Sequence, residues 1–436
     1  MFVHQPSCKM KKYILFVVAS VFFYVNARAQ YCTPDNRFTQ IPVFTVAQIA
    51  YDTAVVYGNA LNYQGQNQDL LLNICYPASA ADTFSKRPLI VLMHGGGFLT
   101  GSRNDLNTMC IEFAKRGFVA VTAGYRLGWN SGSLNCGGDT ISNAKAVYRG
   151  YQDAHAAIRY LVAHAGTYKI DTAWIFAGGE SAGGVNSLNL AFTGQDEMNG
   201  RLPFLQPELG NINNSGNNLD DDFSLKGIFN NWGSIVETGF ITASDAIPVI
   251  AFHGDADQCL PVDSGRYSNC PNYIMMFGSR SICKRLESLG ICTELTVKPG
   301  GDHGIYDETT ASDVFRVGRA CCFFKSLFCS NCSPAYLTDS VSPDCEATSI
   351  NNYENDDEAG IYPNPCTGRF TVCKSIGREA LTGLRIFNIL GENVFQNNDC
   401  GQQATFNVDL MGLAKGVYFV EIKSASRIIT QKLIVH

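Results

Sequence analysis

Residues 172–184 read TAWIFAGGESAGG, and this stretch decides the fold that we expect. Its apolar start is typical of a strand, and the pattern G-x-S-x-G around Ser181 is typical of a sharp turn from that strand into a helix. Such a turn exposes the serine hydroxyl, as a nucleophile requires. A motif of five residues also occurs by chance, so Ser181 can equally be a small residue in a tight glycine turn. The rest of the chain has to decide between these interpretations.

Strand and helix patterns alternate on both sides of this stretch. Helical apolar spacing occurs in residues 144–166, 281–290 and 311–328. The continuous apolar runs typical of buried parallel strands are RPLIVLMH (87–94), FVAVTAGYRL (118–127), LKGIFNNWG (225–233), IPVIAFHG (247–254) and CTELTVKPG (292–300). The pattern predicts an α/β domain with a mostly parallel sheet covered by helices on both faces. Two upstream runs, 53–58 and 69–77, are expected to form an antiparallel edge.

The composition changes after residue 333. Residues 334–358 are polar and acidic without either period, which predicts a linker. Residues 359–436 contain short strand-like runs separated by Gly and Asn, which predict a small C-terminal β-sandwich. We therefore expect a catalytic domain in residues 30–333, a linker, and a second domain.

The first 29 residues have the features of a cleaved export signal. Lys9, Lys11 and Lys12 precede the apolar run YILFVVASVFFYV, and a small-x-small cleavage site precedes Gln30. The apolar run of about 13 residues is shorter than the roughly 20 that a membrane-spanning helix needs. Signal removal takes away these lysines and Arg28 but no acid, so the formal charge changes from −6 to −10. This charge disfavours a nucleic-acid partner.

The chain has 17 cysteines, and 16 remain once Cys8 leaves with the signal. A high, even number in an exported chain predicts disulfide bonds, although their connectivity cannot be deduced from sequence. Candidates close in sequence are Cys259 with Cys270, Cys283 with Cys292, and Cys329 with Cys332. A zinc site is disfavoured because vicinal cysteines are awkward tetrahedral ligands and no histidine lies near; its ligands would be Cys321, Cys322, Cys329 and Cys332.

A second glycine motif, HGGGF at residues 94–98, follows the strand-like run that ends at Met93. Successive glycines let backbone N–H groups approach and bind an anion. A serine nucleophile also needs a base. Among the histidines we favour His303, on a glycine-rich loop after a strand, because ligands bind at the carboxyl ends of parallel strands. His155 and His164 are expected on a helix, and His253 in a structural role.

The acid that orients this base should lie between Ser181 and His303, on another loop at a strand end. The stretch HGDADQCLP offers Asp255 and Asp257, with Asp263 just beyond, and we favour Asp257. Its role would be to hold the imidazole tautomer and stabilise the imidazolium, without taking the proton. Asp302 is expected to be a loop carboxylate.

Residues 50–328 resemble the esterase and carboxylesterase branches of the α/β-hydrolase superfamily. HGGGF is similar to the oxyanion loop of hormone-sensitive-lipase-like esterases, GESAGG to the carboxylesterase elbow, and HGDADQCLP to the acid loop, with Leu260 in place of the usual valine. The resemblance implies the α/β-hydrolase fold and a cofactor-free, metal-free hydrolase. It implies Ser181 as nucleophile, Asp257 as acid and His303 as base, with oxyanion N–H groups from Gly96, Gly97 and Ala182.

The tail resembles a different family, the C-terminal sorting domains of type IX secretion substrates. The resemblance rests on IYPNPCTGRFTV, LRIFNILGENVF, LAKGVYFVEI and the terminal KLIV, in that order. It implies export through the periplasm and the outer membrane by the secretion machinery, to the cell surface or outside. The alternative is a carbohydrate-binding or adhesive sandwich.

Together these features predict a secreted serine carboxylesterase. Only residues 234–246 separate two strands where a large cap could be inserted, so we expect an open crevice, with residues 127–145 as a small lid. Short-acyl or carbohydrate esters, such as acetylated or feruloylated polysaccharide, would suit that crevice. The alternatives are a prolyl-oligopeptidase-like peptidase, a lipase or polyester hydrolase, and a non-catalytic adhesion module.

Overall fold

The structure is a computed structural model. It describes residues 30–338 except 79, 83, 134–135 and 306–309, then residue 345, and residues 360–436 except 363, 365, 374–380, 390, 398–404 and 425–427. The expected signal, residues 1–29, and most of the expected linker lie outside the described residues. The chain divides into two compact units, Met1–Asn351 and Asn352–His436.

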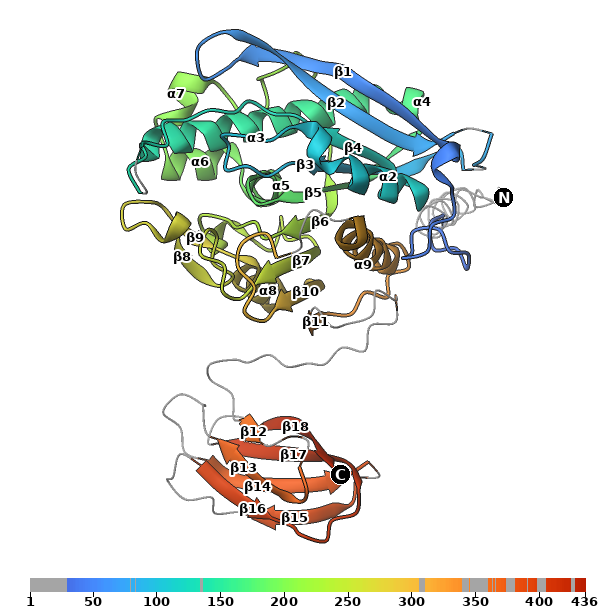
Figure 1. Cartoon of the computed structure of the whole chain (residues 1–436), viewed down its shortest axis with the longest axis vertical. Helices are drawn as coiled ribbons and strands as arrows, with labels where there is room; N and C mark the ends of the chain where they lie inside the picture. Colours follow the sequence, from blue (N-terminus) through green and yellow to red (C-terminus); the bar gives the residue numbers. More distant parts are fainter. Residues whose placement is uncertain are drawn as a thin grey trace, which may run out of the picture. The chain divides into compact units, whose positions relative to one another are not determined.

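The first unit is built on a nine-stranded sheet in the order β1-β2-β4-β3-β5-β6-β7-β10-β11 (Figure 1). β1 pairs with β2, and β2 with β4, in antiparallel fashion, as the upstream runs predicted. All other pairs are parallel. The strands are β1 (Ile49–Leu61), β2 (Asn67–Pro77), β3 (Arg87–Met93), β4 (Val119–Ala123), β5 (Ile170–Glu180), β6 (Leu225–Asn231), β7 (Val249–Gly254), β10 (Thr293–Lys298) and β11 (Ala335–Thr338).

Helices cover both faces of this sheet, as the continuous apolar strands require. Leu89 and Val91 of β3 point into the core beneath α3, α5 and α8, while Ile90 and Leu92 point to the opposite core beneath α2 and α9. The helices are α2 (Asn107–Lys115), α3 (Thr140–Ala163), α4 (Ala165–Tyr168), α5 (Ala182–Phe192), α6 (Gln195–Arg201), α7 (Leu205–Leu209), α8 (Ser279–Ser288) and α9 (Thr310–Phe328). The α/β-hydrolase fold class is confirmed.

Two details differ from the sequence-based expectation. The predicted linker starts at residue 334, but β11 (Ala335–Thr338) joins the sheet by pairing with β10. An edge strand pairs on one side only and needs little apolar patterning, so composition did not reveal it. The predicted lid, residues 127–145, includes the first turns of α3, whose N-terminus is capped by Asp139 through the N–H groups of Ile141 and Ser142.

The second unit is a small sandwich of two antiparallel sheets, β12-β13-β16 and β15-β14-β17-β18. Alternate residues such as Val372, Ile386, Val420 and Leu433 form its buried core. Its strands are β12 (Gly360–Tyr362), β13 (Arg369–Cys373), β14 (Leu381–Asn388), β15 (Asn393–Asn397), β16 (Thr405–Asp409), β17 (Gly416–Ser424) and β18 (Ile428–Val435).

Disulfide bonds are present, but none of the three pairs suggested by sequence proximity forms. The observed pairs are Cys32–Cys329, Cys136–Cys270, Cys292–Cys332 and Cys322–Cys345. These bonds use three of the four sulfurs of the zinc alternative, so that alternative is excluded. Cys259 and Cys283 remain free thiols. Tertiary folding, and not sequence separation, brings the paired Cα atoms within bonding reach.

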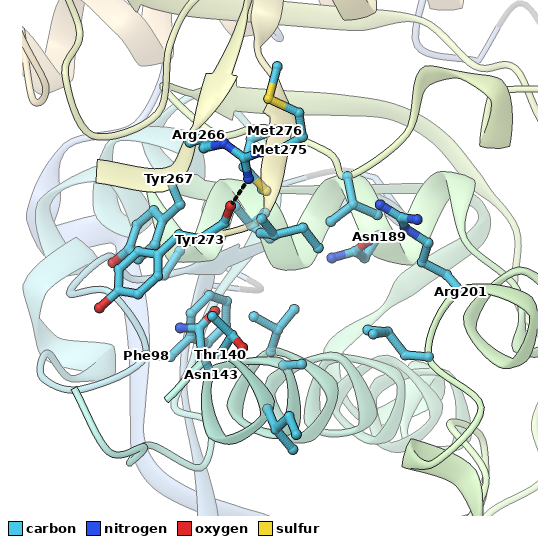
Figure 2. Close-up of a pocket in the computed structure, with 18 of the residues that line it drawn as sticks. Phe98, Thr140, Asn143, Asn189, Arg201, Arg266, Tyr267, Tyr273, Met275 and Met276 are labelled. Atoms are coloured by element: carbon cyan, nitrogen blue, oxygen red, sulfur yellow. Dashed lines mark hydrogen bonds between the residues drawn. The ribbon is translucent and has the colours of Figure 1, made fainter. Parts of the chain in front are cut away.

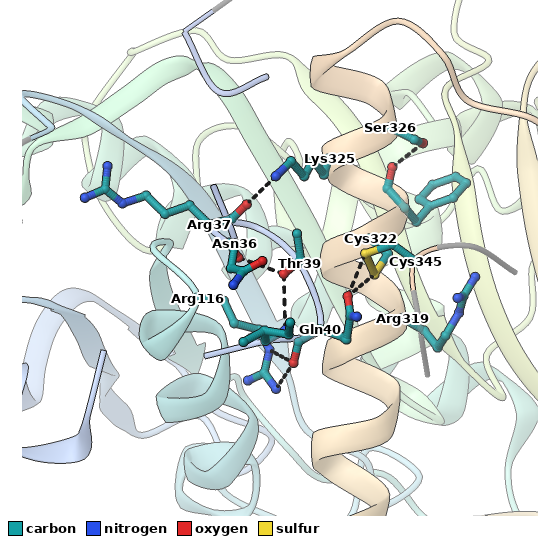
Figure 3. Close-up of a disulfide and its surroundings, with 12 residues drawn as sticks. Asn36, Arg37, Thr39, Gln40, Arg116, Arg319, Cys322, Lys325, Ser326 and Cys345 are labelled. Atoms are coloured by element: carbon teal, nitrogen blue, oxygen red, sulfur yellow. Dashed lines mark hydrogen bonds between the residues drawn. A yellow bond between two sulfur atoms is a disulfide. The ribbon is translucent and has the colours of Figure 1, made fainter. Parts of the chain in front are cut away.

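The Cys322–Cys345 bond joins α9 to a residue beyond β11 (Figure 3). The side-chain oxygen of Gln40 lies 3.3 Å from Cys322 Sγ, and the Gln40 backbone carbonyl accepts hydrogen bonds from Arg116 at 2.9 and 3.2 Å. The N-terminal residues are thereby held against α2 and α9. None of the helices in the described part of the chain is long and apolar enough to cross a membrane.

The pairing of Cys270 gives a test of this disulfide pattern. Cys136→Ser should lower the free energy of unfolding by about 2–5 kcal/mol, because it opens a disulfide that closes a long loop. Cys259→Ser, which changes a free thiol, should have a much smaller effect. Urea unfolding measures both variants, and digestion without reduction should recover the Cys136 and Cys270 peptides linked. Recovery of a Cys259–Cys270 link in the wild type would contradict the structure.

Candidate active site

Ser181 lies on the turn between β5 and α5, as the G-x-S-x-G pattern predicted. Its backbone has φ 51° and ψ −114°, a conformation that is strained for a residue with a side chain. Gly179 and Gly183 make the turn possible, because a Cβ at either position would overlap the carbonyl oxygen of Met93. The Ser181 N–H donates to the Asn231 carbonyl at 2.9 Å, which ties the turn to β6.

The structure brings Ser181, His303 and Asp257 together from three separate loops. Nε2 of His303 lies 2.8 Å from Oγ of Ser181, and Nδ1 of His303 lies 2.8 Å from Oδ2 of Asp257. The loops follow β5, β7 and β10, which end at the same edge of the parallel sheet. The geometry is that of a nucleophile, a base in contact with it, and an acid that orients the base.

Asp257 is held by four donors. Its Oδ1 accepts the backbone N–H groups of Cys259 and Leu260, each at 2.8 Å, while Oδ2 contacts His303 and, at 3.2 Å, Nε2 of His253. Burial acts to raise the pKa of Asp257, but the hydrogen bonds from the two histidines and from Leu260 outweigh it and hold that pKa well below its ordinary range. Asp257 is therefore a carboxylate.

His253 is fully buried beneath Asp257, and its neighbours show that its Nε2 carries a hydrogen. Its Nε2 lies 2.7 Å from the Leu260 carbonyl, which can only accept, so Nε2 carries the proton. Its Nδ1 lies 2.7 Å from the Ser279 hydroxyl, and that hydroxyl accepts a bond from Asn230 at 3.0 Å. The Nε2–H of His253 therefore also faces the Asp257 carboxylate and helps to position it. The structural role expected for it is more specific than the sequence indicated.

The glycine loop after β3 lies against Ser181. A Cβ at Gly95 would be 3.5 Å from the Ser181 Cβ, and Gly96 and Gly97 have φ values of 103° and 60°. Within the described residues, the N–H groups of Gly96 and Gly97 donate to no protein acceptor. Ala182 begins α5, where a helix N–H has no intrahelical partner. All three backbone groups are thus available to an anion beside Ser181.

Two aromatic residues hold this loop in place. The indole N–H of Trp129 donates to the Gly97 carbonyl at 2.9 Å. The Tyr125 hydroxyl donates to the His94 carbonyl at 2.7 Å and its ring stacks on the His94 imidazole. Burial lowers the pKa of His94, although a hydrogen bond to Gly95 partly opposes this. His94 therefore supports the loop, and sequence patterns gave no sign of Trp129.

Glu180, the residue before Ser181, is bound by a buried arginine from α9. Arg316 lies 2.5 Å from the Glu180 carboxylate and also contacts Asn231 at 3.2 Å and Asp313 at 2.8 Å. Its guanidinium lies over the Trp232 ring. This cluster fixes the peptide that precedes the serine. It could not be predicted from the sequence, because its members lie far apart along the chain.

The remaining candidates lie outside the triad. His155 is packed between Tyr151 and Phe223, and Nδ1 of His164 contacts the Tyr160 carbonyl. The other carboxylates accept loop N–H groups or pair with arginine: Asp255 with Gly300 N–H, Asp302 with the N–H groups of Gln258 and His303, and Asp263 with Arg280. No group of three or more metal-ligating side chains occurs in the described residues.

A cavity of about 490 Å³ extends from Ser181 (Figure 2). It is not the open crevice that we expected. Two insertions wall it: α6 and α7 between α5 and β6, and a hairpin of β8 (Ser264–Arg266) and β9 (Met275–Phe277) after β7. From the sequence we considered a large cap only between β6 and β7, and neither insertion lies there.

The low pKa of Asp257 predicts a pH-dependent contribution to stability. A carboxylate with a depressed folded-state pKa stabilises the fold above its unfolded pKa of about 3.9, and the contribution is lost as pH falls toward the folded value. Wild type should therefore be more stable than Asp257→Asn at about pH 7, and the difference should shrink by about pH 3. Urea unfolding at both pH values measures this. A difference that does not change with pH would contradict the assignment.

Each of the two units contains a match to a known family. Residues 72–235 match the model of the BD-FAE family, which is esterase-like, and residues 360–436 match that of the secretion system C-terminal sorting domain. Among solved structures, esterase 2 of Thermogutta terrifontis with propionate bound is 20% identical, covers 67% of this chain and 98% of its own, and has a TM-score of 0.44. Esterase B from Lactobacillus rhamnosis is 17% identical over 74% and 99%, with a TM-score of 0.40.

Curated relatives match only in part. A non-reducing polyketide synthase of Aspergillus novofumigatus is 32% identical over 83 residues, which are 19% of this chain and 4% of the synthase. A neuroligin-like protein of Caenorhabditis elegans is 33% identical over 114 residues, or 26% of this chain and 14% of that protein. This chain thus spans a small fraction of the length of either relative.

The sorting domain marks the chain for the type IX secretion machinery and hence for the cell surface or the medium. The first unit matches an esterase-like family and also contains the mostly parallel sheet and the serine elbow. The chain is therefore an esterase-type α/β-hydrolase that carries a C-terminal sorting domain for type IX secretion.

Proposed function

We propose that this chain is a secreted serine carboxylesterase with the triad Ser181, Asp257 and His303. The observation that carries the proposal is the pair of 2.8 Å contacts that link Ser181 Oγ to His303 Nε2 and His303 Nδ1 to Asp257. The contacts occur at a strained elbow beside backbone N–H groups that have no acceptor among the residues that the structure describes. This combination supports attack on a carbonyl carbon.

In the first half-reaction, Nε2 of His303 takes the proton of the Ser181 hydroxyl while Oγ attacks the ester carbonyl carbon. The carbonyl oxygen becomes an oxyanion that the N–H groups of Gly96, Gly97 and Ala182 stabilise. The tetrahedral intermediate then breaks its bond to the alcohol oxygen, and that oxygen takes the proton from Nε2. An alcohol leaves, and Ser181 holds the acyl group. Asp257 stabilises the imidazolium throughout.

Water completes the reaction. It gives a proton to His303 Nε2 as its oxygen attacks the acyl carbon, and the same N–H groups stabilise the second oxyanion. The intermediate breaks its bond to Ser181 Oγ, which recovers the proton, and a carboxylic acid leaves. The proton moves through His303, because the nitrogens of His253 contact Leu260 and Ser279 and do not reach Ser181.

The natural ester is expected to be extracellular, because the sorting domain exports the enzyme. A carbohydrate remains a fitting alcohol component of this ester. On the acyl side, the cavity of about 490 Å³ is far larger than an acetyl group requires. We therefore expect the enzyme to prefer esters of bulkier acyl groups to acetate esters.

Removal of the nucleophile tests the proposal most directly. Ser181→Ala should lower kcat on p-nitrophenyl butyrate by at least about 10⁴-fold, since the chemistry is lost while binding remains. Ser244→Ala, at an exposed serine far along the chain, is the matched control and should retain full activity. A fluorophosphonate probe should label the wild type at Ser181 and leave Ser181→Ala unmodified.

Hydrolysis of acetylated and feruloylated xylan by the same proteins would extend the result to carbohydrate esters. A folded wild-type chain that hydrolyses no ester and takes up no probe would overturn the proposal and favour a non-catalytic adhesion module.

Trp129 gives a second test, because it acts through the oxyanion loop. Trp129→Phe removes the N–H that holds the Gly97 carbonyl and should lower kcat about tenfold, less than the 10²–10³-fold typical of losing an oxyanion donor itself. KM should change little. Trp174→Phe, at a half-buried residue that packs against the core on the opposite face of the sheet, is the control for general loss of an indole. A rise in KM with kcat unchanged would contradict this role.

A further inference from the structure

The cavity beside Ser181 is a slot whose long wall is one face of α5. Ser181, Val185 and Asn189 follow one another at intervals of four residues and all line it. Eight residues of helix span about 12 Å, so Asn189 lies about that far along the helix axis from Ser181. The first turns of α3 lie across the slot from Asn189, with Thr140 and Asn143 labelled in Figure 2. Ala144 and Val147 of the same helix also line the slot.

The middle of the slot is apolar. Side chains from four segments of the chain close it, and they include Met198, Leu202, Leu205, Phe240 and Met276. A hydrocarbon or aromatic group gains free energy along these walls in proportion to the apolar surface that it buries. Acetate is too short to reach them.

The end of the slot away from Phe98 is polar and carries hydrogen-bond donors. Asn189 is 1% exposed, its Oδ1 accepts the Thr193 hydroxyl at 3.1 Å, and Figure 2 shows its amide nitrogen directed into the cavity. Arg201, at the end of α6, extends toward Asn189 in the same view. Within the described residues Arg201 is exposed and forms no ion pair.

We propose that the slot is an acyl-binding subsite for an extended acyl group that ends in a hydrogen-bond-accepting oxygen, with a carboxylate preferred. This inference rests on the proposed serine esterase function. The acyl carbonyl lies at Ser181, the apolar length follows α5, and Asn189 and Arg201 donate to the terminal oxygens. An acyl group with a methyl end would leave these donors unpaired.

Two esters matched in length test the assignment. The mono-p-nitrophenyl ester of octanedioic acid and p-nitrophenyl octanoate differ only at the far end of the acyl chain. Wild type should favour the half-ester in kcat/KM by about tenfold, as a partly exposed charge-assisted pair allows. Arg201→Gln should remove most of that preference and leave octanoate unaffected. Lys284→Gln, which removes an exposed cation of α8, should leave the preference intact.

The outcomes separate this inference from the proposed function. Hydrolysis of both esters that depends on Ser181, with a ratio that Arg201→Gln does not change, overturns the subsite and leaves the esterase proposal standing. If neither ester is hydrolysed, the subsite is tested by calorimetric binding of octanedioate and octanoate. Tighter binding of octanedioate that Arg201→Gln abolishes supports it, and equal binding overturns it.

Discussion

The close contact of the α5 turn with the carbonyl of Met93 is the constraint on which the active site depends. It leaves no room for a side chain at Gly179 or Gly183, so β5 runs directly into α5 and Ser181 takes a left-handed backbone conformation. The Arg316–Glu180 pair and the Asn231 carbonyl hold the peptide on either side of this strained conformation. The same contact orients α5, whose face then lines the acyl slot.

A second layer of buried polar groups fixes the parts that meet Ser181. Asp257 receives four donors, and His253 supplies one of them from Nε2, whose proton the Leu260 carbonyl requires. Trp129 and Tyr125 hold the glycine loop on the other side. Preorganised dipoles of this kind stabilise developing charge without having to reorganise during the reaction, which is usually the largest single contribution to catalysis. The proposed catalytic geometry is thus supported from both sides of the serine.

Much of the fold could be predicted because it follows from patterns within short stretches of sequence. Apolar runs alternating with amphipathic helices imply a parallel sheet, and the glycine pattern around Ser181 implies the elbow. The candidate residues His303 and Asp257 followed from their positions after strands, since carboxyl ends of parallel strands share an edge. The disulfide pairs, β11 and the cover formed by α6, α7 and the β8–β9 hairpin did not follow. Each depends on contacts between segments far apart in sequence.

The sequence by itself determined the fold class, the two-unit organisation, the export route and the identity of three residues that the structure then places in contact. Only the tertiary structure decided that Cys270 bonds Cys136, that His253 supports Asp257, that Arg316 reaches Glu180, and that the slot ends at Asn189 and Arg201. The physical reason is the distance along the chain over which each kind of information acts. Hydrophobic periodicity and glycine spacing act within one strand or helix, whereas pairing and cavity shape depend on how the whole sheet brings its loops together.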